Sequence, residues 1–214
     1  MTSAAHEIPF SGVRVRFDSD KTFDELTSDL LADIGTEPAR ITDLQALADR
    51  DWSAFATDVQ RQAGPSDFML MHLIDHSLWL STAGVERKAL RVVLGNPLIA
   101  ITMIRHDLTA GLFAPVEVLL TDEDNNRSAL TYVKPSSLMV VEENPPLRAA
   151  ALALDDKLAA LAMKVSSSGD TPRTRPAHRL SVDTFDLKAS AFRDRQGKLT
   201  ARDEMCPRET WPAR

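Results

Sequence analysis

The residues of this chain that could do chemistry are few, and most of them are histidines and aspartates. His72 and His76 lie four residues apart, and His106 directly precedes Asp107. A carboxylate raises the pKa of a neighbouring imidazole and desolvation lowers it, so such a pair can be tuned toward neutrality. His76, His106 and Asp107 are therefore the candidate acid–base residues, provided that the fold brings them together. Asp107 also fits a purely structural role as the N-cap of a short turn at 108–111.

Whether His72 and His76 could share a metal ion depends on the conformation of their segment. A strand separates residues four apart by about 13 Å. One zinc ion cannot bridge that gap, because its bonds to nitrogen are about 2.0–2.1 Å long. We therefore predict no metal site and leave the cofactor unknown. A single histidine at a strand end, His76, could still ligate haem or carry a proton.

The tripeptide Gly95-Asn96-Pro97 marks a second kind of candidate site. Asn96 is suited to capping a helix that begins at Pro97, and a helix start can also bind a small anion through its free N–H groups. Gly95 would allow the ligand to approach closely. The phenol of Tyr132, the only tyrosine, could donate to a ligand in the same cleft. The predicted ligand-binding residues are Gly95, Asn96, Tyr132 and His72.

Two apolar runs, 92–94 and 116–120, bracket this tripeptide and are typical of buried strands. The residues between them predict a helical crossover that joins the two strands. The segment 68–76 is apolar on both faces, which predicts a central strand covered on both sides. In a regular strand, Leu70 and His72 would lie on one side of this segment together with Ile74 and His76.

The remaining elements are predicted by their end signals. Residues 12–17 alternate between apolar and basic side chains, as a half-buried strand does. Thr22 and Glu25 have the spacing of a capping box and begin an amphipathic helix. The polar run 122–127 predicts a hairpin, and Asn144 caps a last helix of about 20 residues.

Composition excludes several classes of function. The net charge is −6 and the isoelectric point is near 5.4, which disfavours nucleic acid and anionic membranes as partners. With one cysteine, Cys206, the chain can form neither an internal disulfide nor a cysteine-based zinc site. The N-terminal residues show no signal-peptide pattern and no run approaches 18 apolar residues, so we predict a cytoplasmic location and no membrane span.

Four features occur together in order: Ile74-Asp75-His76, Gly95-Asn96-Pro97, the tripeptide 110–112 before Ala114-Pro115, and a hairpin ending in Thr131-Tyr132. With the initial strand and helix, this arrangement resembles the DUF302 family of domains of unknown function. The resemblance implies an α/β fold, a two-layer sandwich of a mostly antiparallel sheet with helices packed on it, over residues 12–164. It also implies a homodimer. The stretch 36–67 is then a helical insertion, and residues 165–214 are an extended or poorly packed tail.

Three functions stay open. The first is an uncharacterised small-ligand-binding or accessory domain, homodimeric, that binds a small anionic or organic ligand between residues 95–97, His76 and Tyr132. The second is a cofactor-poor enzyme of the lyase, isomerase or cyclase type that acts on a small organic acid through a His/Asp pair. The third is a protein-interaction module that uses the basic tail 165–214, which has 10 lysines and arginines against 7 acidic residues.

Overall fold

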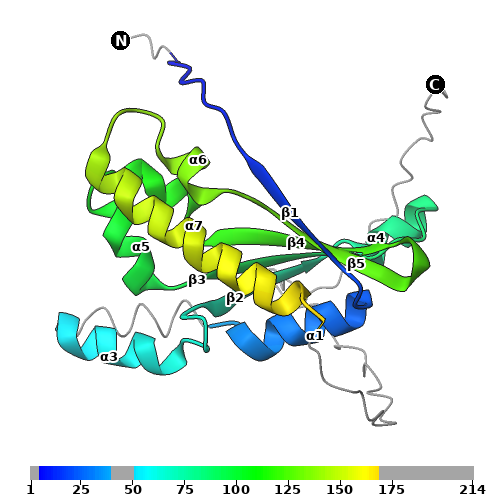
Figure 1. The fold of residues 1–214 in the computed structure, drawn as a ribbon. Coiled ribbons are helices and arrows are strands. Elements are labelled where there is room, and N and C mark those ends of the chain that lie inside the picture. The colour runs from blue at the N-terminus through cyan, green and yellow to red at the C-terminus, as the bar shows by residue number, and fades with distance from the viewer. Residues whose placement is uncertain (1–4, 40–50, 169–214) are drawn as a thin grey trace, which may run out of the picture. The chain divides into compact units, whose positions relative to one another are not determined.

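The computed structural model describes residues 5–39 and 51–168. These residues form an antiparallel sheet with helices packed on one face (Figure 1). The strands are β1 (Arg14–Ser19), β2 (Met69–Asp75), β3 (Ala89–Gly95), β4 (Val116–Glu123) and β5 (Arg127–Val133). The α-helices are α1 (Phe23–Ile34), α3 (Trp52–Gln62), α4 (Ser77–Leu80), α5 (Pro97–Ile104), α6 (Pro135–Met139) and α7 (Pro145–Ser166). Three 3₁₀ turns complete the described elements: η1 (Ser81–Ala83), η2 (Leu108–Phe113) and η3 (Asp124–Asn126).

The five strands lie in the order β1-β5-β4-β3-β2, and every neighbouring pair is antiparallel. The predicted two-layer α/β sandwich is confirmed. The helix predicted between β3 and β4 is present as α5. However, β3 and β4 are antiparallel neighbours, so the connection that carries α5 and η2 is a long hairpin loop and the predicted crossover is wrong.

The helix ends follow the capping chemistry that the sequence indicates. The Thr22 hydroxyl accepts from the Glu25 N–H, and the Glu25 carboxylate accepts from the Thr22 N–H, which completes the capping box of α1. Asn144 accepts from the Leu147 N–H at the start of α7. Asn125 and Asn126 adopt left-handed backbone conformations in the β4–β5 turn, a conformation that asparagine tolerates better than most residues. These predictions are confirmed.

The prediction for β2 is wrong in two respects. Among the described strands, β2 lies at the edge of the sheet beside β3, so it is not central. A bulge between Leu70 and His72 also breaks the alternation: Leu70 pairs with Leu94 and His72 with Val93. As a result Leu73 faces the helices with Leu70, while His72 faces the opposite side.

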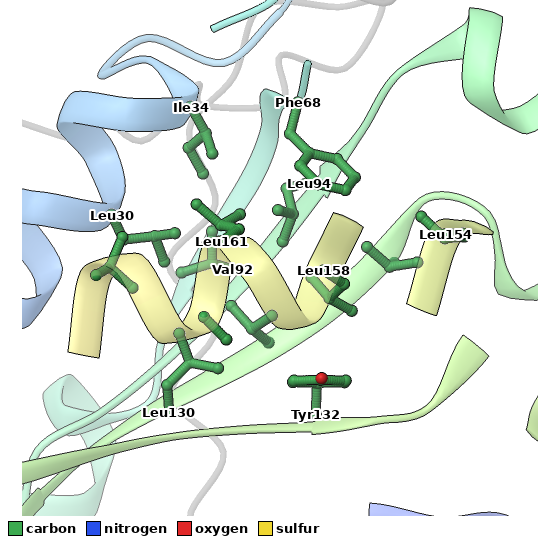
Figure 2. Packing of buried hydrophobic residues seen from close by; sticks show 14 of the residues in the cluster. Leu30, Ile34, Phe68, Val92, Leu94, Leu130, Tyr132, Leu154, Leu158 and Leu161 are labelled. Atoms are coloured by element: carbon green, nitrogen blue, oxygen red, sulfur yellow. The ribbon is translucent and has the colours of Figure 1, made fainter. Parts of the chain in front are cut away.

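The hydrophobic core lies between the sheet and the helices α1 and α7 (Figure 2). Val92, Leu120 and Leu130 point into it from three strands, and Leu30 and Leu158 meet them from the two helices. Each of these side chains is at most 1% exposed. At roughly 25 cal/mol for each Å² of buried apolar surface, this layer supplies the main stabilisation of the fold.

Two buried carboxylates connect the segments around this core through hydrogen bonds. Asp33, whose side chain is 2% exposed, accepts from both the N–H and the hydroxyl of Ser66 and from the Lys164 ammonium at 2.6 Å. Asp155 accepts in the same way from the N–H and hydroxyl of Ser136. Asp33 thus ties α1 to α7 and to the loop before β2, and Asp155 ties α6 to α7.

Part of the sequence prediction concerns residues that the structure does not describe. The predicted helix in the insertion 36–67 includes residues 40–50, which lie outside the described residues. Within the described part, α3 begins at Trp52, where the Asp51 carboxylate accepts from the N–H groups of Ser53 and Ala54. Apart from residues 165–168, the predicted tail also lies outside the described residues.

Candidate functional site

Within residues 5–39 and 51–168, the face of the sheet opposite the core is open except at one end, where η2 and α6 lie beside it. Strand register places its side chains in rows that run from β2 to β1. The first row is His72, Val93, Glu117, Val133 and Arg14, and the second is Ile74, Arg91, Leu119, Thr131 and Arg16. The third is His76, Ala89, Thr121, Ala129 and Asp18. Except for Ala129, all are exposed or half-buried. We call this surface the open face.

A groove of about 930 Å³ lies on the open face. Its floor is formed by β1, β5 and β4, with Arg91 from β3 and His76 from the end of β2. A wall of apolar side chains closes the end where η2 and α6 lie. This wall, which we call the apolar wall, consists of Leu112, Phe113, Pro115, Pro135 and Leu138.

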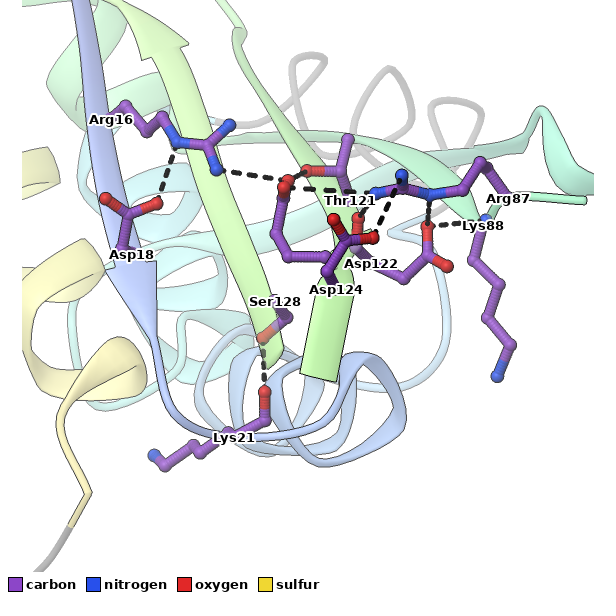
Figure 3. A network of polar contacts seen from close by, with 10 residues as sticks. Arg16, Asp18, Lys21, Arg87, Lys88, Thr121, Asp122, Asp124 and Ser128 are labelled. Carbon is purple, nitrogen blue, oxygen red and sulfur yellow. Dashed lines mark hydrogen bonds and ion pairs between the residues drawn. The ribbon is translucent and has the colours of Figure 1, made fainter. Parts of the chain in front are cut away.

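The charged residues of the lining are three arginines and one glutamate. Arg91 forms an ion pair with that glutamate, Glu117. Arg16 donates to Asp18 at 2.8 Å and forms an ion pair with Glu123 at 3.1 Å (Figure 3). Arg14 is exposed and forms no hydrogen bond or ion pair with any described residue through its side chain. The lining therefore carries a net positive charge, and the uncompensated cation is Arg14.

Beyond this lining, a further ion-pair cluster fixes the β4–β5 hairpin. Arg87 donates to the Asp122 carboxylate at 3.1 Å and also to the Asp122 carbonyl (Figure 3). The Asp122 carboxylate accepts from the Lys88 N–H as well. These contacts hold the start of β3 against the end of β4. They are structural, because each partner is satisfied within the chain.

His76 is the predicted acid–base residue that lines the groove. It directly follows β2, and in the third row its N–H donates to the Ala89 carbonyl at 2.9 Å. Its ring lies edge-on to Trp79, with the ring centroids 5.6 Å apart. Within the described residues, its ring nitrogens form no hydrogen bond, so they are available to a ligand.

His106 and Asp107 do not line the groove. Asp107 caps η2: its carboxylate accepts from the N–H of Thr109 at 2.8 Å and from the Thr109 hydroxyl at 2.7 Å. These two hydrogen bonds lower the pKa of Asp107 below its ordinary value. His106 is exposed, and its carbonyl accepts from the Asn144 side chain. The N-cap role is confirmed, and the acid–base roles of His76, His106 and Asp107 stay predictions.

Tyr132 lies at the boundary between the groove and the core. The residue contributes to the groove lining, but it is 5% exposed and faces the helix-covered side (Figure 2). Its ring stacks on that of Phe17. Burial raises the pKa of the Tyr132 phenol, and the charge of Asp155 raises it further. The phenol is therefore neutral at physiological pH.

Gly95 and Asn96 lie outside the groove lining, and the chain itself uses their polar groups. The Asn96 side chain accepts from the Leu98 N–H and donates to the Asp67 carbonyl. The next two N–H groups of α5 donate to the Asn96 carbonyl. A side chain at Gly95 would lie 2.9 Å from the Pro115 side chain, so glycine is needed there for packing. The ligand roles of Gly95, Asn96 and the exposed His72 stay predictions.

The sequence reasoning did not single out Arg14, Arg91 and Leu119. A signal for Arg14 was present, because alternation in residues 12–17 places it opposite the apolar side chains. Recognising the groove also required the strand order, which brings β1, β5 and β4 together. The described residues also show neither of two further features. No group of three or more His, Cys, Asp or Glu could hold a metal ion, and no described helix is long and apolar enough to cross a membrane.

Fold and open face together define a two-layer α/β sandwich whose sheet is covered on one side. The family model for "Domain of unknown function DUF302" matches residues 45–165, more than half of the chain, so the chain belongs to this family. The match confirms the resemblance identified in the sequence. No curated protein matches the chain.

A solved structure supports the fold. The crystal structure of an uncharacterised conserved DUF302 protein from Bacillus stearothermophilus is similar, with a TM-score of 0.51 and 16% sequence identity. The similarity covers 72% of this chain and 98% of that one. At this identity the likeness is one of fold.

Proposed function

We propose that the chain is a small-ligand-binding domain whose binding site is the groove on the open face. The observation that supports this most strongly is the lining itself, which joins an apolar wall to a few convergent polar groups. Ligand sites in proteins commonly have this composition and volumes of roughly 300–1,000 Å³. The groove, at about 930 Å³, is within that range.

The open face can serve this purpose because the fold does not depend on it. An antiparallel sheet can be stable with one face in water, provided that the other packs on a core. The core residues of this chain project from the opposite face of the same strands. A ligand on the open face would therefore contact side chains that are free to serve binding.

The proposal is tested by filling the groove. Leu119 and Thr131 face each other across β4 and β5 on its floor. Leu119→Trp and Thr131→Trp should each displace a bound apolar dye, such as anilinonaphthalene sulfonate, and lower its fluorescence. Leu152→Trp provides a control, since Leu152 is an exposed residue of α7 outside the groove. Equal dye binding by the wild type and both folded groove variants would refute the proposal.

We also propose that the chain forms a homodimer. The supporting observation is a set of exposed apolar side chains at the apolar wall of the groove: Phe10 contacts Phe113, and the neighbouring Leu112 is 79% exposed. Exposed apolar clusters of this kind often mark interfaces. Sedimentation equilibrium should give twice the chain mass, and Phe10→Ser with Leu112→Ser should reduce it. A wild type of single-chain mass would refute this part.

A further inference from the structure

We propose that the groove binds an organic carboxylate with an apolar body, its carboxylate at Arg14 and its body on the apolar wall. This inference rests on the proposed ligand-binding function and adds the chemical class of the ligand. It concerns one end of the groove, where β1 begins.

Arg14 differs from the other strand arginines in lacking a carboxylate partner among the described residues. Every other arginine in the strands has a carboxylate partner: Arg16 pairs with Asp18, Arg91 with Glu117, and Arg127 with Asp20. Arg14 alone has none among the described residues. A guanidinium presents paired N–H donors that match a carboxylate, so it favours carboxylates over neutral ligands.

Arg14 also lies close to the apolar side chains of β5 and α6. It lies directly opposite Val133, and the preceding residue is tied to α6, because the Val13 N–H donates to the Ser137 hydroxyl at 2.9 Å. Leu138 of the same short helix lines the groove. The cation thus lies beside the apolar wall, so a ligand could bind through both charge and apolar contact.

The opposite end of the groove, at His76, does not suit the carboxylate. His76 directly follows β2, four strand spacings from β1, which corresponds to roughly 19 Å across the sheet. A single carboxylate cannot reach both. Arg91, which lies nearer to His76, is already neutralised by Glu117. Glu117 in turn is the only acidic residue of the lining, and its pairing with Arg91 reduces its repulsion of an anion at Arg14.

The experiment compares three probes of nearly the same shape: cinnamate, cinnamamide and cinnamylamine. Their dissociation constants are measured with the full chain by nuclear magnetic resonance titration. Acetate is added as a carboxylate without an apolar body. We expect cinnamate to bind about three- to fivefold more tightly than cinnamamide, because an ion pair with an exposed arginine contributes at most about a factor of five. Cinnamylamine and acetate should bind most weakly.

The variant Arg14→Gln should abolish the preference for cinnamate over cinnamamide while leaving cinnamamide binding unchanged. Arg127→Gln is the matched control, because Arg127 lies on the neighbouring strand outside the groove lining and is paired with Asp20. It should keep the preference. Screening by salt should weaken cinnamate binding and not cinnamamide binding.

The outcomes separate this inference from the proposed function. If cinnamate and cinnamamide bind the groove equally, or if Arg14→Gln keeps the preference, the carboxylate assignment is wrong and the ligand-binding function stands. If the tryptophan variants Leu119→Trp and Thr131→Trp leave dye binding unchanged, the proposed function fails, and this inference fails with it.

Discussion

The two faces of the sheet are built from the same strands and have opposite properties. On β4, Val118 and Leu120 point toward the helices and are at most 2% exposed, while Leu119 and Thr121, which alternate with them, lie on the groove floor. The covered face packs leucines and valines against α1 and α7. The open face carries arginines, threonines and a few apolar side chains. Alternation along a strand thus separates residues that stabilise the fold from residues that can bind.

This separation has a physical consequence. A protein interior is close-packed, so a change on the covered face leaves a cavity and costs stability. A change on the open face leaves the core intact and alters only what the groove can hold. Substitutions at neighbouring residues of one strand should therefore differ in their effects on stability and on binding.

The largest contrast is expected between Leu120→Ala and Leu119→Ala. Leu120 is completely buried, so its truncation should lower the free energy of unfolding by about 2–5 kcal/mol. Leu119 is half-buried on the open face, and its truncation should cost about 1 kcal/mol or less. Urea unfolding followed by circular dichroism measures both. Equal losses would contradict the assignment of the two faces.

The second contrast concerns polar contacts. Asp33→Asn removes the charge of a buried carboxylate that holds Ser66 and Lys164, and should cost about 1–3 kcal/mol. Glu117→Gln breaks the exposed ion pair with Arg91 on the open face and should cost roughly 0–1 kcal/mol. Thermal unfolding at one pH compares them. A larger loss for Glu117→Gln would mean that the open face contributes more to stability than its exposure indicates.

The third prediction uses Tyr132 as a reporter of the covered face. As the only tyrosine, it can be titrated by the ultraviolet absorbance of tyrosinate. Its pKa should lie above the ordinary value near 10, chiefly because of burial and also because of Asp155. Asp155→Asn should lower the pKa of Tyr132 partly toward its ordinary value.

The sign of the linked change in stability follows from this shift. A phenol whose pKa is raised by folding binds its proton more tightly in the native state than in the unfolded state. The contribution of this phenol to the free energy of unfolding is complete at pH values below the pKa of the unfolded state. It is lost as the pH rises through the pKa of the folded state. If the titration midpoint of Tyr132 in the folded chain equals its midpoint in guanidinium chloride, the ring is not buried.

The smallest expected effect is at Asp107. Its hydrogen bonds with Thr109 lower its pKa, so Thr109→Val should raise that pKa toward the ordinary value of a carboxyl group. Carboxyl carbon shifts measured by nuclear magnetic resonance over an acidic pH range follow this change. If the pKa of wild-type Asp107 lies above its ordinary value, the carboxylate is free to act as a base and the capping account is wrong.

The parts of the fold that could be predicted from sequence are those set by local chemistry. Capping by Thr22, Asn96 and Asn144 depends on side chains within a few residues of the backbone groups they satisfy. The position of β2 could not be read in this way. Its two-sided apolar pattern, FMLMHLIDH, arises from a bulge that shifts the alternation, and an apolar edge strand resembles a central one in sequence.

The candidate site was harder to predict for the same reason. His76 was identified because a histidine at the end of an apolar strand is noticeable in the sequence, and it does line the groove. Arg14 is one of many exposed arginines. Its environment depends on contacts with β5 and α6, more than 100 residues away in the chain. The contacts in the folded chain are needed to see that Arg14 lacks the carboxylate partner that the other strand arginines have.

The most direct test of the central claim is to map where cinnamate binds. Backbone amide shifts of the full chain should change at Arg14, Val133 and Leu138 during a titration, because these residues surround the proposed carboxylate site. Amides of α7 on the covered side should not move. Shift changes confined to α1 and α7, or none at saturating cinnamate, would contradict the assignment of binding to the open face.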